Sequence, residues 1–278
     1  ASGDVVFIGY QSGKRARGSG NTAMGYGSLY GADSTAANNT GTYNTAIGQY
    51  ALRWFSKTIG STAVGAEAGY YTTGSYNTFV GYKAGHGGTT SAPYSSGPNN
   101  TAIGYQALLN FTTAEDNTAV GMFAGRLLTT GHSNTLLGNG AGDTMTATSN
   151  TVLIGLNAGT AINHTGADGT VAIGRSAGAA ITSGASNIAI GYEALKVHTT
   201  GHSNLAIGYG AMNDTDAGST SSDSDHNVAI GLNSMGGTWT NVKSEQNVAI
   251  GNSTMDSALD GALYNTTVGY ASLSSLTT

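Results

Sequence analysis

Short apolar runs, each closed by a glycine, recur along the whole chain. Thr45, Ala46 and Ile47 precede Gly48 in this way, and Val-Ala-Ile precedes Gly251. A run of this length is too short for a helix, and its β-branched residues favour a strand. The glycine and the asparagine that often opens the run suit tight corners, because both tolerate positive φ. The pattern therefore predicts many short strands separated by turns.

These runs belong to one internal repeat. Each motif glycine follows Ile, Val, Leu or Met and is itself followed, three positions later, by Ala, Ser or Thr. The fifteen motif glycines are Gly9, Gly25, Gly48, Gly65, Gly81, Gly104, Gly121, Gly138, Gly155, Gly174, Gly191, Gly208, Gly231, Gly251 and Gly269. Their spacing is 16 to 23 residues, most often 17, which is too short for a propeller blade of roughly 40 residues.

The repeat predicts an all-β fold, a β-solenoid of about fifteen short coils in one repeat domain over residues 1–278. Three long intervals predict insertions near 31–43, 86–99 and 213–226. Insertions in a solenoid map to loops on a coil edge, which is often the functional side.

Side chains alternate along a strand, so each run has a bulky face and a small face. We expect the bulky residues to fill the core, among them Ile190, Ile207, Ile230 and Ile250, and the small alanine face to receive another layer, such as a second chain. We also expect asparagines stacked at one corner to form a hydrogen-bonded ladder. The ladder asparagines are Asn21, Asn44, Asn100, Asn117, Asn187, Asn204, Asn227 and Asn247.

Composition narrows the function classes. The chain has 44 glycines among 278 residues, no cysteine and a net charge of −5. Without cysteine it is neither a disulfide scaffold nor a cysteine-ligated zinc protein. Its negative charge disfavours nucleic acid as a partner, and no apolar run approaches the roughly 18 residues of a membrane span. We therefore expect no nucleic-acid binding and no membrane insertion.

One acidic segment has the partial spacing of a calcium loop. Asp214, Asp216, Asp223 and Asp225 include carboxylates at alternate positions, but the bidentate glutamate that closes such a loop is missing. A solvated insertion is the favoured interpretation, calcium is the alternative, and we expect no other cofactor.

The other polar candidates have unremarkable explanations. Glu67 and Glu193 occupy the same position of the repeat, and a glycosidase needs only two close carboxylates. An exposed repeat position is the favoured interpretation of both, and the chain is predicted not to be an enzyme. The basic cluster Lys14 to Arg17 predicts a solvated turn, with contact to an anionic glycan or lipid as the alternative.

Aromatic residues in the variable parts of the coils are the candidate receptor or glycan contacts. Exposed rings stack well on sugars and on protein partners. The alternative is that they cap the core or pack between chains. The candidates are Tyr30, Tyr43, Trp54, Phe55, Tyr94 and Trp239.

The repeat resembles two families of surface fibres. The unit Asn-x-Ala-Ile-Gly-x-x-Ala is similar to the head repeat of trimeric autotransporter adhesins of the YadA type. Gly104-Tyr-Gln-Ala-Leu108 and Gly191-Tyr-Glu-Ala-Leu195 resemble the repeats of phage tail-fibre-like proteins. The resemblance covers Gly9 to Leu273 and implies a left-handed β-roll, three chains side by side and an extracellular location on a virion tail fibre or bacterial surface. The units here are longer and more variable than those of compact autotransporter heads.

Three functional hypotheses follow. The leading one is a non-enzymatic adhesive fibre module, a homotrimer that binds a host surface glycan or protein and other fibre or virion components. The second is a monomeric solenoid that binds ice or another ordered surface through threonines stacked at one repeat position. The third is a glycan-degrading tailspike, which the low number of carboxylates disfavours.

Overall fold

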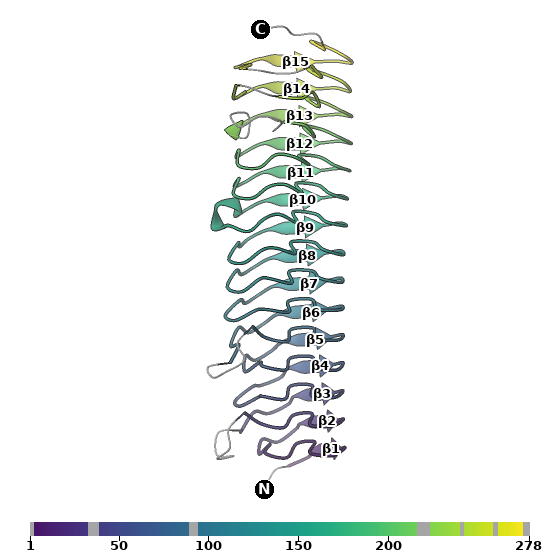
Figure 1. Ribbon diagram of the computed structural model, residues 1–278, viewed down its shortest axis with the longest axis vertical. Coiled ribbons are helices and arrows are strands. Elements are labelled where there is room, and N and C mark those ends of the chain that lie inside the picture. The colour runs from purple at the N-terminus through teal and green to yellow at the C-terminus, as the bar shows by residue number, and fades with distance from the viewer. Residues whose placement is uncertain are drawn as a thin grey trace. The chain divides into compact units, whose positions relative to one another are not determined.

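A computed structural model describes residues 3–32, 39–88, 94–215, 223–239, 242–257 and 261–274. The chain forms two compact units, Ala1–Asn139 and Gly140–Thr278, and each is a parallel β-solenoid (Figure 1). Within the described ranges there is no α-helix, and no helix there has the length and apolarity to cross a membrane. The predicted all-β solenoid is confirmed, whereas its left-handed sense, its single-domain extent and the three-chain arrangement stay predictions.

Every motif copy forms a three-residue strand that ends directly before the motif glycine. The first unit contains β1 (Val6–Ile8), β2 (Thr22–Met24), β3 (Thr45–Ile47), β4 (Thr62–Val64), β5 (Thr78–Val80), β6 (Thr101–Ile103), β7 (Thr118–Val120) and β8 (Thr135–Leu137). The second contains β9 (Val152–Ile154), β10 (Val171–Ile173), β11 (Ile188–Ile190), β12 (Leu205–Ile207), β13 (Val228–Ile230), β14 (Val248–Ile250) and β15 (Thr266–Val268), with a short 3₁₀ turn, η1 (Thr165–Ala167), between β9 and β10.

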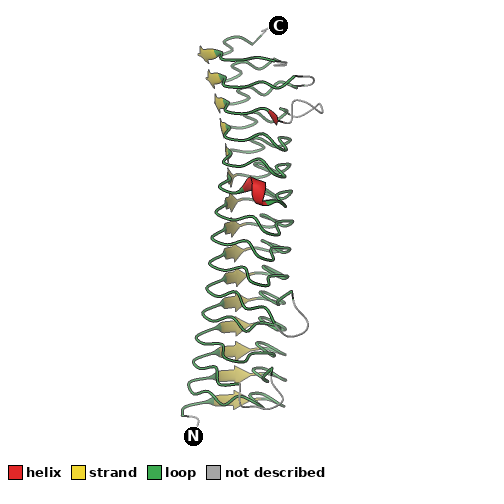
Figure 2. Ribbon diagram, turned by 90° about the vertical axis from the view of Figure 1, so that its left-hand side faces the viewer, coloured by secondary structure: helices red, strands yellow, loops and turns green. Residues whose placement is uncertain are grey.

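Within each unit, every strand pairs in parallel with the strand of the next coil. Thr22, Ala23 and Met24 lie opposite the equivalent residues of β3, and the amide of Gly48 donates to the carbonyl of Met24 at 2.8 Å. The strands line up along one side of the coils, and turns complete each coil (Figure 2). Equivalent residues of successive coils therefore lie one above another.

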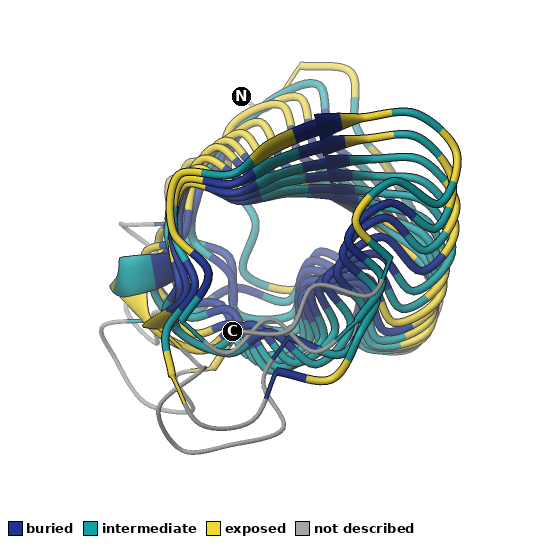
Figure 3. Cartoon of the chain, turned by 90° about the horizontal axis from the view of Figure 1, so that it is seen from above, coloured by how far each residue is buried: buried dark blue, intermediate teal, exposed yellow. Residues whose placement is uncertain are grey.

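The predicted orientation of the strands is wrong. The alanines between the bulky residues are fully buried, whereas Ile47, Ile103 and Ile250 are 37–39% exposed. Ile190, Ile207 and Ile230 also lie on the outer face, half-buried. Figure 3 shows buried strand positions between more exposed neighbours. The reason is space: the coil interior also holds large side chains from the opposite wall, so the strand contributes a methyl group.

Two interior positions of a coil are never both large, and in the coils of β4, β7 and β10 both are small. Where the inward strand residue is large, as in Phe7, Phe79, Leu136 and Leu153, the fourth residue after the motif glycine is a glycine. A Cβ on Gly85 would lie 2.2 Å from the Phe79 ring. Where the fourth residue is leucine or methionine, the inward strand residue is alanine or, in β15, threonine. Close packing explains the rule, because the coil has room for one large side chain at this level.

The motif glycine is required by the stacking of the coils. Gly121 has a φ of +138°, and a Cβ there would lie 2.4 Å from the carbonyl oxygen of Gly138 in the next coil. Neither the backbone angle nor the distance tolerates a side chain. Successive coils therefore touch backbone to backbone at this corner.

The buried asparagines form a ladder at the corner that opens each strand. The Oδ1 of Asn204 accepts from the backbone amide of Asn227 at 3.0 Å and from its side-chain Nδ2 at 3.2 Å. The Nδ2 of Asn204 donates to Oδ1 of Asn187 at 3.2 Å and to the carbonyl of Ser224 at 2.9 Å. In the first unit the same contacts join Asn21 to its successor, with distances of 2.9 and 3.1 Å. Each asparagine thus satisfies backbone groups in its own coil and in a neighbour.

We expect Asn204→Ala to destabilise the protein by about 1–3 kcal/mol, because it removes the acceptor of the buried backbone amide of Asn227. Urea unfolding followed by circular dichroism measures this loss. Asn163→Ala, at an exposed turn position, is the control and is expected to change stability by less than about 0.5 kcal/mol. Equal stability of the two variants would contradict the structural role of the ladder.

Candidate functional site

Five side chains form a column on the first unit, which we call the cation–aromatic column. They are the fifth residues after the motif glycines of the first five coils, namely Lys14, Tyr30, Arg53, Tyr70 and His86. Backbone hydrogen bonds join these positions from coil to coil; for example, the amide of Gly31 donates to the carbonyl of Arg53. The in-register stacking of the coils therefore brings together residues that are 16 to 23 positions apart in the sequence.

Cations and rings alternate along this column. Lys14 Nζ lies 5.6 Å from the centre of the Tyr30 ring, and the Arg53 guanidinium lies 5.0 Å from it. On its other side Arg53 approaches Tyr70 at 5.9 Å, and Tyr70 stacks on His86 at 5.2 Å. These distances fall within the range in which an aromatic ring attracts a cation.

Four further side chains extend the column into a patch. Trp54 and Tyr71 both stack on Tyr94, with ring centres 5.8 and 5.9 Å from that of Tyr94. Tyr71 also contacts Tyr70 edge to face at 4.5 Å, and Arg15 covers Tyr30 at 4.8 Å. We call the column together with Arg15, Trp54, Tyr71 and Tyr94 the cation–aromatic patch.

The patch unites three of the six aromatic residues that the sequence singled out. Tyr30 and Trp54 come from the variable halves of their coils, and Tyr94 comes from the insertion at 86–99. The sequence interpretation missed Lys14 as their partner, and also Arg53 and Tyr70. Comparing the fifth residue after each motif glycine gives Lys, Tyr, Arg, Tyr and His in successive coils, and this comparison would have found the column.

The other three aromatic candidates lie elsewhere. Phe55 and Trp239 are fully buried, so they belong to the core and their assignment as receptor contacts is corrected. Large rings fill these coil interiors because the strand side supplies only alanine. Tyr43 is 70% exposed, and its ring covers Gly20, where a Cβ would lie 2.5 Å from the ring. Residues 33–38, 89–93 and 216–222 of the three insertions lie outside the described residues.

The patch carries a positive charge that no carboxylate of the described residues pairs with. In the described part of the protein, no carboxylate pairs with Lys14, Arg15 or Arg53. The Nε and Nη1 atoms of Arg53 and the Nε1 atom of Trp54 are buried without a hydrogen-bond partner. Buried polar groups in folded proteins are nearly always hydrogen-bonded, so these three atoms make Arg53 and Trp54 candidates for contact with a bound partner or water.

Glu67 pairs with Lys83 beside the column and with His86 at its end. Its carboxylate lies 3.5 Å from Lys83 Nζ and 3.4 Å from His86 Nε2. Burial lowers the pKa of His86, although the Gly87 carbonyl and Glu67 oppose the effect. Burial also raises the pKa of Tyr71, helped by the neighbouring Tyr70 and Tyr94. Both shifts favour the uncharged form of the side chain, so the charge of the patch comes from its lysine and arginines.

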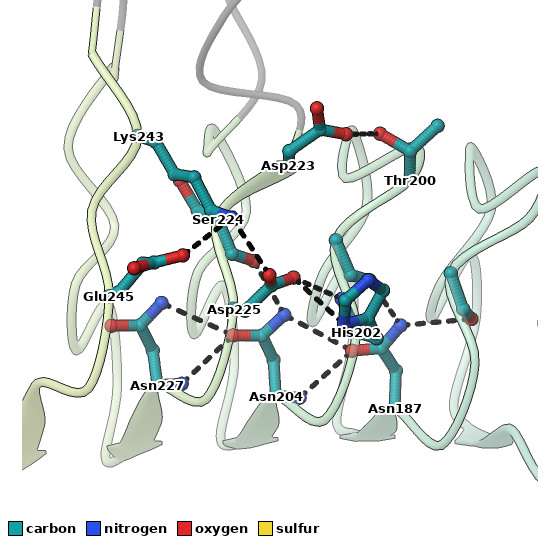
Figure 4. Close-up of polar contacts among 12 residues, drawn as sticks. Asn187, Thr200, His202, Asn204, Asp223, Ser224, Asp225, Asn227, Lys243 and Glu245 are labelled. Carbon is teal, nitrogen blue, oxygen red and sulfur yellow. Dashed lines mark hydrogen bonds and ion pairs between the residues drawn. The ribbon is translucent and has the colours of Figure 1, made fainter.

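The aspartates of the predicted calcium segment have protein partners. Asp225 is nearly buried; it accepts from the backbone amide of His202 at 2.7 Å and lies 3.1 Å from Lys243 Nζ (Figure 4). Lys243 also pairs with Glu245 at 2.5 Å. These contacts run beside the asparagine ladder and link neighbouring coils of the second unit.

The remaining aspartates give no metal site either. Asp223 accepts from the Thr200 hydroxyl at 2.5 Å, Asp214 accepts from the Thr238 hydroxyl, and Asp216 lies outside the described residues. Among the residues that the structure describes, no group of three or more histidines and carboxylates could hold a metal ion. The three described aspartates thus have partners within the protein, and both interpretations of the segment stay predictions.

Comparison with known proteins adds no family assignment. No family model matches the chain, and no curated protein or solved structure matches it. The chain is a β-solenoid repeat protein on the strength of its own structure, and its resemblance to tail fibres and adhesins stays a prediction.

A buried histidine makes the second unit sensitive to pH. His198 Nδ1 lies 3.1 Å from the Thr215 hydroxyl, and its Nε2 lies 3.0 Å from the Gly201 carbonyl. Burial lowers the pKa of His198 from 6.5 to about 4. The unfolded chain therefore takes up this proton at a higher pH than the folded chain does.

We expect the free energy of unfolding to fall as the pH drops from about 6.5 to about 4, with His198 contributing up to about 3 kcal/mol. Denaturant unfolding at several pH values measures the slope. Carboxylates titrate in the same range, so the test compares the wild type with His198→Gln. The free energy of unfolding of the variant should depend less steeply on pH. His132→Gln, at an exposed position, should retain the pH dependence of the wild type. If His198→Gln also retained it, the role of His198 in this pH dependence would be contradicted.

Proposed function

We propose that this chain is a non-enzymatic structural and adhesive module of a surface fibre, which associates with copies of itself and binds a host surface glycan or protein. The support comes from the repeat, which is entirely architectural, from its resemblance to fibre repeats, and from the cation–aromatic patch. In this proposal the fibre is extracellular, on a virion tail or bacterial surface, and the glutamates serve in ion pairs rather than in catalysis. Glu193, for example, lies 3.1 Å from Lys196 Nζ.

The apolar character of the outward strand face supports self-association. In the second unit both outward positions of β9 to β14 are Val, Ile or Leu, and they stack in register without an intervening charge. Leu205 lies directly opposite Ile188 and Val228 in the neighbouring strands. A contiguous apolar face of this kind marks an interaction site in soluble proteins.

A further copy of the same chain fits this face best. Its coils have the same spacing, so each apolar row of one copy meets an equivalent row of the next without a change of register. The resemblance to trimeric repeats gives the number of chains in the proposal, a homotrimer.

We expect the wild-type chain, whose mass is 27.8 kDa, to sediment at about three times that mass. Changing both Leu205 and Ile207 to glutamate should give a folded monomer, because charges on this face cannot be buried against another chain. Analytical ultracentrifugation measures the mass, and circular dichroism checks the fold. Asn163→Glu introduces a charge at an exposed turn and should remain associated; a monomeric wild type would rule out self-association.

A second candidate function rests on the outer face of the first unit. Thr22, Thr45, Thr62, Thr78, Thr101, Thr118 and Thr135 occupy equivalent outward positions of β2 to β8. In-register strands space them by about 4.8 Å, which is a regular array of hydroxyl and methyl groups. Such an array suits an ordered surface such as ice.

If this second function holds, the chain produces thermal hysteresis in freezing solutions, and Thr101→Glu placed in the middle of the array abolishes it. Thr199→Glu, outside the strands, is the control. A wild-type chain without hysteresis at millimolar concentration removes this candidate and leaves the fibre proposal in place.

A further inference from the structure

We infer that the cation–aromatic patch is a binding site for a linear acidic polysaccharide, whose carboxylate or sulfate groups pair with Lys14, Arg15 and Arg53. This inference deepens the proposed function, since it gives the adhesive module a ligand class and a location. It rests on the contacts of the first unit alone.

Charge is the first argument. The patch holds three cations that no carboxylate of the described residues neutralises, in a chain whose net charge is −5. Arg53 lies between Tyr30 and Tyr70 and also faces Tyr50, 4.4 Å from the centre of that ring. Its partial burial among rings weakens the screening of its charge by water, which strengthens the attraction of an anion. The missing partner of the patch is therefore an anion.

Geometry is the second argument. Lys14 and Arg53 stand two coils apart in the same column, about 10 Å at the spacing of stacked strands, and the whole column is about 19 Å long. A linear polymer with charges at regular intervals can follow such a column, whereas a compact anion would contact one coil. The repetition of the protein thus favours a repetitive ligand.

The chemistry of the rings distinguishes the kind of polymer. The faces of Tyr30 and Tyr70 are covered by their cationic neighbours, so the column offers ring edges and tyrosine hydroxyls to a ligand. Hydroxyl groups donate and accept hydrogen bonds, and they match the hydroxyl groups of sugars. Nucleic acid would need more phosphate contacts than three cations provide, because such contacts dominate its affinity.

The test measures the binding of the full-length chain to immobilised polygalacturonate and dextran sulfate by biolayer interferometry. Carboxyl-reduced polygalacturonate and unmodified dextran are the neutral counterparts. We expect binding to at least one polyanion and none to its neutral counterpart; the polyanion that binds tells whether carboxylate or sulfate is preferred. Binding should weaken between 50 and 500 mM salt, as expected for charge pairing.

Variants place the site on the patch. Arg53→Gln should weaken binding at least about tenfold, because it removes a charge that pairs with the anionic groups of the polymer. Arg175→Gln is the matched control, since Arg175 lies 5.6 Å from the Tyr192 ring in the second unit but outside the column; it should leave affinity within about twofold of wild type. If Arg53→Gln does not fold, the double variant Lys14→Gln and Arg15→Gln tests the same site at the end of the column.

Three results would overturn the inference: no binding to either polyanion, equal binding to the neutral polymers, or equal losses in Arg53→Gln and Arg175→Gln. Preferential binding of single-stranded DNA over both polyanions would overturn it as well. The fibre proposal fails separately, through a monomeric wild type in ultracentrifugation. A trimer that binds a neutral glycan or a protein would retain the fibre proposal and reject the acidic polysaccharide.

Discussion

The close approach of backbone to backbone at the motif glycine is the constraint on which the rest of each unit depends. A Cβ at this corner would lie well inside the van der Waals distance of the next coil's carbonyl, as at Gly121. The corner therefore fixes where one coil stands on the next, and the strand that precedes it pairs in register. The asparagine ladder, the outward apolar rows and the cation–aromatic column are all consequences of that register.

Most of the fold could be predicted from the sequence because its signal is repeated fifteen times. Any single Val-Ala-Ile run is ambiguous, but the constant distance between asparagine, strand and glycine identifies the strand and both corners. The two faces of the strand could not be assigned in the same way, since alternation tells only that Ala249 and Ile250 point to opposite sides. The answer depends on what fills the coil from the opposite wall, such as Leu52 and Phe55, which lie outside the strand.

The candidate site was only partly predictable, for a related physical reason. Tyr30, Trp54 and Tyr94 stand out as aromatic residues in variable segments, and the structure brings them into one patch. Their cationic partners carry no such signal, because an isolated Lys14 or Arg53 resembles any solvated side chain. Only the register of the coils shows that they alternate with rings. The opposite error, at Phe55 and Trp239, arose because burial depends on the space within a coil and not on residue type.

Two interior positions of a coil are never both occupied by large side chains, and this constraint limits how such a repeat can be rearranged. At most one of the two positions is large: Phe79 faces Gly85 in one coil, Ala102 accompanies Leu108 in the next, and Ala63 with Gly69 leaves both small. The motif between these positions is the most uniform part of the repeat, so it is the natural place for recombination between copies. A crossover there would join Phe79 to Leu108, two large side chains in a space for one, while the reciprocal product would have alanine and glycine, as the coil of β4 has. Whole coils can thus be duplicated or lost as units, whereas packing disfavours one of the two products of exchange through their most similar segment.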